Sequence, residues 1–269
     1  MFLYSIKRFY LFLIILFLFS CNHKSSEKVF IPTGKKIEHT RNYYKKAERI
    51  TYSAQYGVFH VGDIVIETSK GLKPQDNIPC YHVKVSSVLS GSVGFVFSIN
   101  DSWESFVDTT SLLPYKFSKS LRENKYRKTD YTIFDRTLEK AFVTDTTSPH
   151  NPELHNYSIT PTIEDMISSF FLLRNVPFEQ MKVNDTAIVD VFMDDRCYNI
   201  RVKLLGEEKI KVKSKRYKAY VITTAIAEVE SEEHVKCWIS ADEKRIPLKV
   251  RLKLPVISAE LELKEYKSN

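Results

Sequence analysis

The 269-residue sequence contains few glycines and cysteines, and it lacks the motifs that mark several common kinds of site. The 7 glycines are scattered, and they form no phosphate-binding loop and no nucleophile elbow. The 4 cysteines include no Cys-x-x-Cys pair and no zinc-ligand spacing, and no calcium-loop or zinc-protease signature occurs. We therefore assign no catalytic residue, metal ligand or cofactor, and we expect a protein that is not an enzyme.

The charge pattern argues against nucleic acid as a partner. The formal net charge is +7, and the basic residues are spread along the chain rather than clustered in a binding motif. One exception is a ladder of lysines at alternate positions, Lys209, Lys211, Lys213 and Lys215, with Ile210 and Val212 between them. This pattern is typical of a solvent-facing strand. The alternative is a stripe that binds anionic lipid headgroups or glycans.

The amino terminus has the features of a lipoprotein signal peptide. Lys7 and Arg8 precede an uncharged apolar run over residues 9–19, which is too short to span a bilayer comfortably. The run ends in Leu-Phe-Ser-Cys at residues 18–21, which resembles the lipobox of bacterial lipoproteins. That resemblance implies a signal peptide over residues 1–20, removed before Cys21, and a diacylglycerol attached to the Cys21 thiol. A plain signal peptide or an uncleaved anchor are the alternatives.

The residues after Cys21 are polar and show no apolar period, so we expect residues 21–46 to be a lipidated cysteine followed by a flexible tether. Asn22 stands where many lipoproteins of the inner membrane carry an aspartate. By analogy this favours anchoring in the outer membrane, facing the periplasm rather than the cell surface. The membrane is then a partner through the lipid anchor.

Alternation of apolar and polar residues dominates the rest of the chain and predicts strands with one buried face. In residues 246–254 every even position is aliphatic and the odd positions are Pro, Lys, Arg and Lys. Residues 81–85 and 257–263 alternate in the same way. Further strands are expected at residues 48–56, 60–68, 97–107, 115–122, 127–134, 186–193, 197–204, 208–213, 217–228 and 234–239. So many strands with short connections predict antiparallel sheet.

Three cysteines and two aspartates in this part of the chain have simple structural explanations. Cys80, Cys197 and Cys237 are either small apolar fillers or include one disulfide, and the sequence does not name a pair. Asp194 and Asp195 lie between two expected strands, where a tight turn favours Asp, Asn or Gly.

Helical periodicity occurs convincingly once, over residues 162–174. Thr162 is the expected cap, and Pro177 follows the end of the helix. The preceding segment, residues 144–161, is polar and contains three prolines, so we expect a long loop. A helix with an apolar face must lie on a sheet. We predict a mainly β protein with a single domain over residues 47–269: a strongly curved antiparallel half-barrel with one helix on its concave side.

Aromatic residues are expected where the helix meets the sheet. If helix and sheet do not fill the space between them, an apolar cavity able to hold an acyl chain results. If they interlock, the same side chains are ordinary core. The candidate residues are Phe95, Phe97, Met166, Phe170 and Phe171.

The order of several stretches resembles the bacterial domain of unknown function 3108 family of exported proteins. The stretches are AERITYSAQYGVFHVGDIVIET (47–68), YHVKVSSVLSGSVGFVFSINDSWESFVD (81–108), LLPYKFSKSLREN (112–124), DMISSFFLLRNVPF (165–178), VKLLGEEKIKV (202–212) and CWISADEKRIPLKVRLKLPVISAELELKEY (237–266). The resemblance implies a β-rich envelope fold similar to the half-barrels of outer-membrane lipoprotein carriers. It brings no catalytic residues with it.

These observations lead to three functional expectations. The first is a cell-envelope lipoprotein, not an enzyme, that binds or carries an apolar or amphipathic envelope ligand. The second is a scaffold that holds another envelope protein through exposed strand edges. The third is a hydrolase whose site is assembled only in three dimensions, which would need a cleft with convergent acidic and histidine groups.

Overall fold

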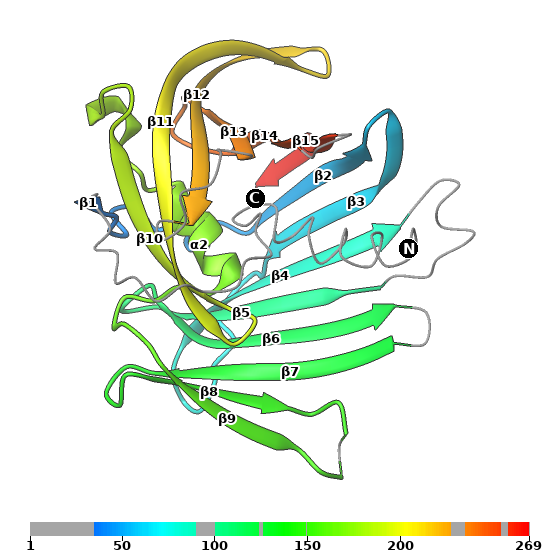
Figure 1. Ribbon diagram of the computed structural model, residues 1–269, viewed down its shortest axis with the longest axis vertical. Helices are drawn as coiled ribbons and strands as arrows, with labels where there is room; N and C mark the ends of the chain where they lie inside the picture. The colour runs from blue at the N-terminus through cyan, green and yellow to red at the C-terminus, as the bar shows by residue number, and fades with distance from the viewer. Residues whose placement is uncertain are drawn as a thin grey trace.

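The computed structural model describes residues 35–89, 100–123, 126–148, 150–226, 235–253 and 258–268. In these residues one continuous sheet wraps around one α-helix (Figure 1). The helix is α2 (Met166–Leu173), and two short 3-10 helices are η1 (Tyr43–Lys45) and η3 (Phe178–Gln180). The strands are β1 (Lys35–Lys36), β2 (Glu48–Tyr56), β3 (Phe59–Thr68), β4 (Cys80–Leu89), β5 (Ser102–Asp108), β6 (Pro114–Glu123), β7 (Tyr126–Asp135), β8 (Lys140–Asp145), β9 (Glu153–Ser158), β10 (Thr186–Met193), β11 (Arg196–Val212), β12 (Lys215–Ile226), β13 (Val235–Ser240), β14 (Pro247–Lys253) and β15 (Ser258–Ser268).

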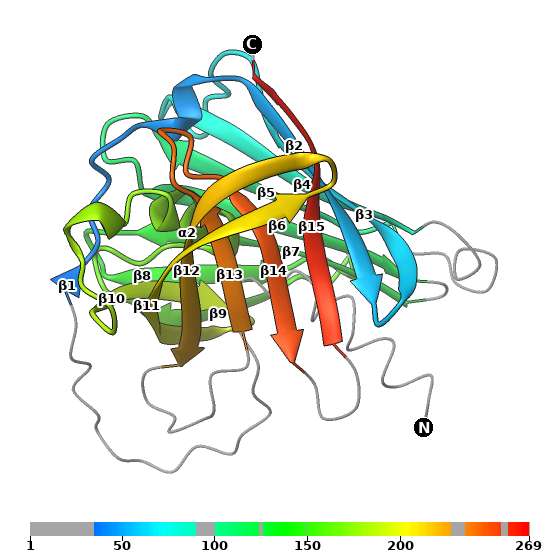
Figure 2. The same ribbon diagram turned by 90° about the horizontal axis from the view of Figure 1, so that it is seen from above.

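The strand order is β1-β10-β11-β12-β13-β14-β15-β2-β3-β4-β5-β6-β7-β8-β9. All neighbouring pairs are antiparallel except β1 and β10. The sheet curls so that α2 lies between its two halves, with β12–β15 on one side and β4–β9 on the other (Figures 1 and 2). The predicted fold class, a strongly curved antiparallel sheet with a helix on its concave side, is confirmed.

Alternating burial explains why most strands were predictable. In β14 the side chains of Leu248, Val250 and Leu252 are buried, whereas those of Arg251 and Lys253 are exposed. Alternation of this kind produces a period of two in the sequence wherever one face of a strand meets the core. The turn between β10 and β11 also follows the prediction, because Asp194 and Asp195 both have positive φ, at 44° and 65°.

The helix starts later than predicted. Asp165, not Thr162, is the cap: its carboxylate accepts hydrogen bonds from the backbone N–H groups of Ile167 and Ser168, and its own N–H donates to Ser168 Oγ. The residues before it are extended because Glu164 lies beside β10: its N–H donates to the carbonyl of Asp190, and its carbonyl accepts from the N–H of Phe192. Tertiary pairing therefore overrides the helical period of residues 162–165.

The prediction of a long loop over residues 144–161 is wrong for the second half of that segment. Residues 153–158 form β9, the edge strand, which pairs with β8. Its side chains are mostly exposed, so no buried face imposes the alternation by which the other strands were found. A second correction concerns residues 197–204 and 208–213, which belong to one strand, β11, interrupted by a bulge between Leu204 and Gly206.

The end of the expected tether is part of the domain. Lys36 Nζ binds Asp190 of β10 at 2.8 Å, and Tyr44 is 2% exposed, with its ring stacked on Phe171 at 4.5 Å. The Asn42 side chain accepts a hydrogen bond from the N–H of Tyr44. These contacts fix residues 36–46, so the described domain begins before the expected boundary at residue 47.

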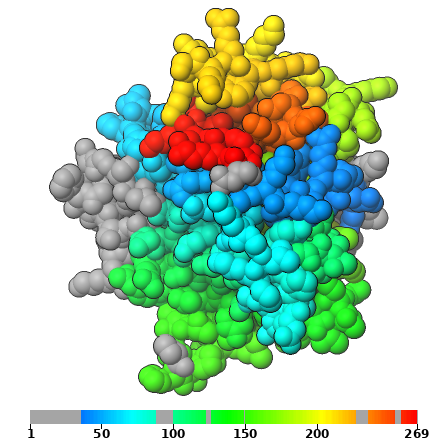
Figure 3. All heavy atoms as spheres, turned by 180° about the vertical axis from the view of Figure 1, so that it is seen from behind, coloured from blue at the N-terminus to red at the C-terminus, as the bar shows by residue number. Residues whose placement is uncertain are grey.

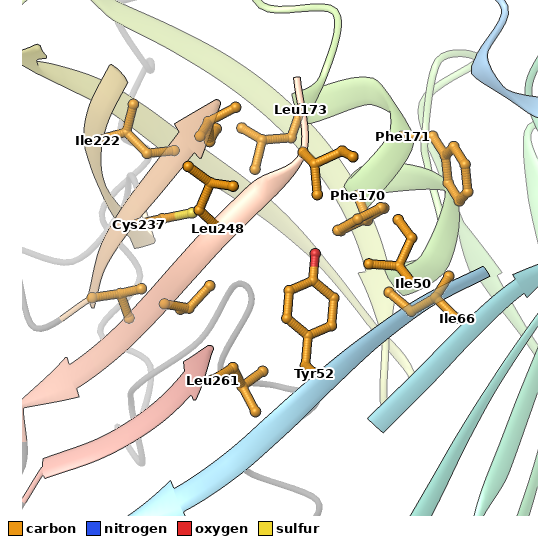
Figure 4. Close-up of a cluster of buried hydrophobic side chains, with 14 of the residues drawn as sticks. Ile50, Tyr52, Ile66, Phe170, Phe171, Leu173, Ile222, Cys237, Leu248 and Leu261 are labelled. Carbon is orange, nitrogen blue, oxygen red and sulfur yellow. The ribbon is translucent and has the colours of Figure 1, made fainter. Parts of the chain in front are cut away.

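The main hydrophobic core lies between α2 and the inner faces of the strands. Figure 4 shows Phe170 and Phe171 directed toward Ile50, Tyr52 and Ile66. Cys80 and Cys237 are buried free thiols, as expected of small apolar fillers, whereas Cys197 is free and exposed; no two of these three form a disulfide. Among the described residues, no helix has the length and apolar character required to cross a membrane.

Candidate functional site

The space between α2 and the sheet is filled in the part of the chain that the structure describes. Phe170 and Phe171 are buried and meet edge to face at 5.3 Å, and Met166 is packed against the core. Beside Met166, Trp103 and Phe192 there remains a cavity of about 20 Å³, which is room for about one water molecule. Met166, Phe170 and Phe171, three of the five candidate cavity residues, are therefore part of the core. Phe95 and Phe97 lie outside the described residues.

The polar side chains at the start of α2 form a buried cluster. Ser105 Oγ donates to Asp165 Oδ2 at 2.6 Å, and His39 Nε2 forms a hydrogen bond of 2.8 Å with Glu164 Oε1. Burial raises the pKa of Asp165 to about 6, because a carboxylate loses its hydration there. Glu164, Asp165 and His39 are enclosed by protein and line none of the hollows described below. The cluster therefore offers the hydrolase alternative no open cleft.

The other end of α2 is held by a buried ion pair. Arg174 donates to both carboxylate oxygens of Glu48 in β2, and also to the backbone carbonyl of Lys244. Tyr266 of β15 donates a hydrogen bond to Glu48, and the Arg174 guanidinium lies 4.1 Å from the centre of the Tyr43 ring. Every part of this group is satisfied, so it serves to fix the helix on the sheet.

The most distinctive surface feature is the projecting hairpin formed by residues 206–219 of β11 and β12, which we call the arm. The arm bends away at the bulge at Gly206, whose φ of 136° favours glycine, and passes over β13–β15 (Figure 2). Its residues stand above β15 in the space-filling view (Figure 3). Near its base, Glu208 Oε2 accepts a hydrogen bond from Trp238 Nε1 at 2.9 Å, which lowers the pKa of Glu208.

The arm has two different faces. The side chains of Ile210, Val212 and Tyr217 pack toward the main core. Those of Lys209, Lys211, Arg216 and Lys218 are exposed. At the turn Lys213 reaches across and donates to the carbonyl of Lys264 in β15 at 2.7 Å. The lysine ladder of the sequence is thus divided: Lys209 and Lys211 face solvent, while Lys213 and Lys215 line a groove.

That groove, which we call the arm groove, lies between the turn of the arm and the ends of β13, β14 and β15. Its volume is about 360 Å³, within the range of small-molecule sites. Its apolar lining includes the half-buried Tyr217 and Tyr266, with the buried Ile246, Leu248 and Leu263. Four cationic side chains line it against two acidic ones: Lys213, Lys215, Lys244 and Lys264 against Asp242 and Glu265.

Both acidic side chains of the arm groove already have partners within the protein. Asp242 Oδ1 accepts hydrogen bonds from Ser240 Oγ and from the backbone N–H groups of Lys244 and Arg245, which hold the β13–β14 turn. Glu265 forms an ion pair with Lys267 at 3.0 Å. Among the described residues, Lys213, Lys215 and Lys244 have no carboxylate at ion-pair distance; Lys244 Nζ lies 4.8 Å from the centre of the Tyr266 ring. The arm groove is therefore cationic and partly apolar.

A wider hollow of about 820 Å³ lies between residues 36–41, the end of α2 and the start of β10. Four cationic and three acidic side chains line it, and three of the cations are engaged: Lys36 binds Asp190 at 2.8 Å, Arg245 binds Glu179 at 2.5 Å and Arg174 binds Glu48. Its charges are therefore more nearly balanced than those of the arm groove, and we regard the arm groove as the better candidate for a ligand.

Comparison with known protein families identifies the family to which this domain belongs. The family described as "Protein of unknown function (DUF3108)" matches residues 51–264. This chain belongs to that family. The match begins inside β2 and ends inside β15, so it includes α2, the whole arm and most of the arm groove.

Among solved structures, a beta-barrel-like protein of domain of unknown function DUF1849 from Brucella abortus is similar to this DUF3108 protein. The TM-score is 0.55 at 10% sequence identity, and the alignment covers 88% of this chain and 100% of that chain. At this identity the likeness shows the fold alone. No protein of curated function matches the sequence significantly.

The residues of the arm groove could not be grouped from the sequence. They come from three segments, residues 212–217, 240–248 and 263–266, which only the strand order β12-β13-β14-β15 brings together. The lysine ladder was the one visible signal, and it located the arm without indicating the groove. Cys21, the expected site of lipid attachment, lies outside the described residues.

Proposed function

We propose that this DUF3108 protein is a lipid-anchored protein of the cell envelope that binds an anionic, amphipathic envelope ligand in the arm groove and catalyses no reaction. The observation that carries the proposal is the combination of cationic and apolar side chains in one groove. Lys213, Lys215 and Lys244 supply positive charge, while the partly buried rings of Tyr217 and Tyr266 supply the apolar surface that is open to a ligand.

Both parts of the groove are needed for the argument. A small hydrophilic anion would be bound by charge alone and would gain nothing from an apolar wall. A purely apolar ligand would leave three lysines without a counter-charge. A molecule with an anionic headgroup and a hydrocarbon portion satisfies both, because its charge meets the lysines while its apolar part leaves water.

The proposed location rests on the amino-terminal sequence. The basic residues, the apolar run of residues 9–19 and Cys21 support export and lipid attachment, and the outer membrane, facing the periplasm, is the proposed site. Metabolic labelling with a palmitate analogue tests the anchor. The wild-type chain should incorporate the label and Cys21→Ala should not. A Cys21→Ala protein that still incorporated it would contradict attachment at this residue.

Native mass spectrometry of protein purified from its own envelope tests the ligand. The wild-type protein should carry a phospholipid-like adduct, and the triple variant Lys213→Gln, Lys215→Gln, Lys244→Gln should lose it. A matched control, Lys70→Gln, Lys73→Gln, Lys253→Gln, removes the same charge from exposed positions outside the groove and should keep it. Repeated recovery of the wild-type protein without any adduct would contradict the proposal.

A scaffold role is the second candidate, because β9 is an edge strand with little cover. Its outward edge has no partner strand among the described residues, and Leu154 is 65% exposed. Such an edge can accept a strand from another protein. In-cell crosslinking from position 154 should then recover a stable envelope partner. Failure to recover one under conditions that capture a known envelope complex would count against this role.

A further inference from the structure

The exposed face of the arm carries positive charge at directly opposed positions. In the register of β11 and β12, Lys209 lies opposite Lys218 and Lys211 lies opposite Arg216. All four side chains are exposed. Like charges that face each other across two strands repel and destabilise the pairing. These four charges therefore do not stabilise the pairing of the two strands.

Compensation on this face is small. Glu207 forms an ion pair with Lys218 at 2.5 Å. Among the described residues, no carboxylate lies at ion-pair distance from Lys209, Lys211 or Arg216. The face therefore has three uncompensated positive charges on a short piece of two-stranded sheet.

Strands elsewhere in the same sheet show a different arrangement. Between β14 and β15, Lys249 faces Glu262 and Arg251 faces Glu260, with Lys249 Nζ 2.6 Å from Glu260. Opposite charges at facing positions stabilise the pairing. The arm departs from this arrangement where it leaves the body of the domain, as expected if its charges serve an external partner.

We propose that this exposed face of the arm docks on an anionic lipid bilayer. Lys209, Lys211, Arg216 and Lys218 lie on one side of a hairpin whose other side is packed toward the domain. An exposed two-stranded face presents its charges along a surface rather than around a pocket. It therefore suits a plane of phosphate headgroups better than a single small anion. The inference concerns a surface distinct from the arm groove and does not depend on the ligand proposed for it.

The shape of the arm supports a surface contact. Because side chains on one face of a strand repeat about every 7 Å and strands lie about 5 Å apart, the four cations fit within one small patch. The patch projects beyond β13–β15 (Figures 2 and 3), so a flat surface can reach it without meeting the rest of the sheet first. Opposed cations that repel in water are stabilised together when a layer of anionic headgroups lies against them.

Vesicle flotation tests the proposal. The chain from residue 22 onward, which contains every buried residue of the described core, is mixed with vesicles of equal parts phosphatidylglycerol and phosphatidylcholine, or of phosphatidylcholine alone. The arm variant is Lys209→Gln, Lys211→Gln, Arg216→Gln, Lys218→Gln. The control variant Lys70→Gln, Lys73→Gln, Lys182→Gln, Lys253→Gln removes the same net charge from exposed positions outside the arm.

The wild type and the control variant should float with anionic vesicles and stay unbound with phosphatidylcholine alone. Each basic residue at an anionic surface raises the partition coefficient roughly fivefold, so loss of four positive charges should lower it on the order of several hundredfold. Added salt should weaken wild-type binding strongly. Equal loss in both variants would mean that net charge alone is sensed, and would overturn the assignment to the arm. Wild-type binding only to an acidic polysaccharide or protein would overturn the assignment to a bilayer.

A structural role for the four cations predicts something different. If they held the arm in place, the arm variant would unfold at a lower temperature than the wild type. Docking predicts a melting temperature equal to or above that of the wild type, because the variant loses cross-strand repulsion. A thermal melt by circular dichroism separates the two, and a clear drop in melting temperature with retained vesicle binding would refute the inference.

Discussion

Arg174 at the end of α2 and the cationic residues of the arm carry the same charge in opposite surroundings. Arg174 is almost completely buried, and Glu48, Tyr43 and the carbonyl of Lys244 surround its guanidinium. Lys211 and Arg216 are exposed, face each other, and have no acidic partner among the described residues. The described part of the domain thus contains a fully satisfied cation at the end of its helix and a group of cations without acidic partners on its arm.

The difference separates charge that serves the fold from charge that serves a partner. A buried charge without a counter-charge would cost several kcal/mol, so Arg174 requires Glu48 for the helix to dock. Exposed charges cost little, so the arm tolerates repulsion that the core would not. Substitutions in the two regions should therefore act on different properties: stability around Arg174, and binding around the arm.

Loss of the acidic partner of Arg174 should have the largest effect on stability. Glu48→Gln keeps the size of the side chain but leaves the guanidinium buried without a counter-charge. We expect the free energy of unfolding to fall by about 3–5 kcal/mol. Urea denaturation followed by tryptophan fluorescence measures it, since Trp103 is buried in the same core.

An exposed ion pair in the neighbouring strands provides the control. Arg49 of β2 and Glu67 of β3 face each other across the pair of strands, and their side chains are 46% and 43% exposed. Glu67→Gln should cost about 1 kcal/mol or less. If Glu48→Gln and Glu67→Gln cost the same, the distinction between buried and exposed charge would fail for this protein.

The buried cap of α2 should produce the next largest effect, through pH. The folded-state pKa of Asp165 is about 6, above the value of about 3.9 expected in the unfolded chain. The unfolded state therefore releases this proton first as pH rises. Stability from this group is complete below pH of about 4 and is lost as pH rises through about 6, a loss of about 3 kcal/mol.

Asp165→Asn isolates that contribution, because the amide keeps the shape of the side chain and its oxygen can still accept from Ile167 and Ser168. Other titrating groups cancel in the comparison. Urea denaturation from pH 4 to pH 7.5 should show the wild type losing stability relative to Asp165→Asn as pH rises. A difference that stays constant across that range would show that Asp165 does not titrate there.

The smallest expected effect lies in the arm. Lys211→Glu places a carboxylate opposite Arg216 and replaces repulsion with attraction. We expect the protein to become more stable by about 0.5–1 kcal/mol while its binding to anionic vesicles decreases. Lys249→Glu, which would face Glu262 in β14–β15, should lower stability instead. Thermal melts of both variants test the pair, and equal signs would contradict the role given to facing charges.

The fold was predictable from the sequence wherever burial produces a pattern of apolar and polar residues. The strand at residues 186–193 was predicted at its observed bounds, because its strongly apolar composition is typical of a buried strand. The edge strand β9 was missed, because Glu153, Leu154 and His155 are exposed and nothing selects for alternation. Residues 36–46 were predicted to be a tether, because the residues that hold them, Asp190, Glu164 and Asn175, are far away in the sequence.

The candidate site was predictable only in part. Alternate lysines at residues 209–215 marked a charged strand and left open whether it binds anions. Which of these lysines face solvent and which line the arm groove depends on the bend at Gly206 and on the contact between Lys213 and Lys264. Met166, Phe170 and Phe171 were correctly expected where the helix meets the sheet, but whether they surround a cavity or fill it is a matter of packing distances.

The sequence by itself determined the mainly β composition, the position of the helix to within a few residues and the basic strand, because these depend on local periodicity and turn residues. Tertiary structure decided how the strands order around α2, that the interior is filled, and that segments near residues 213, 244 and 264 meet in one groove. The physical reason is that close packing and charge pairing depend on distances between residues far apart in the chain, which the order of residues does not state.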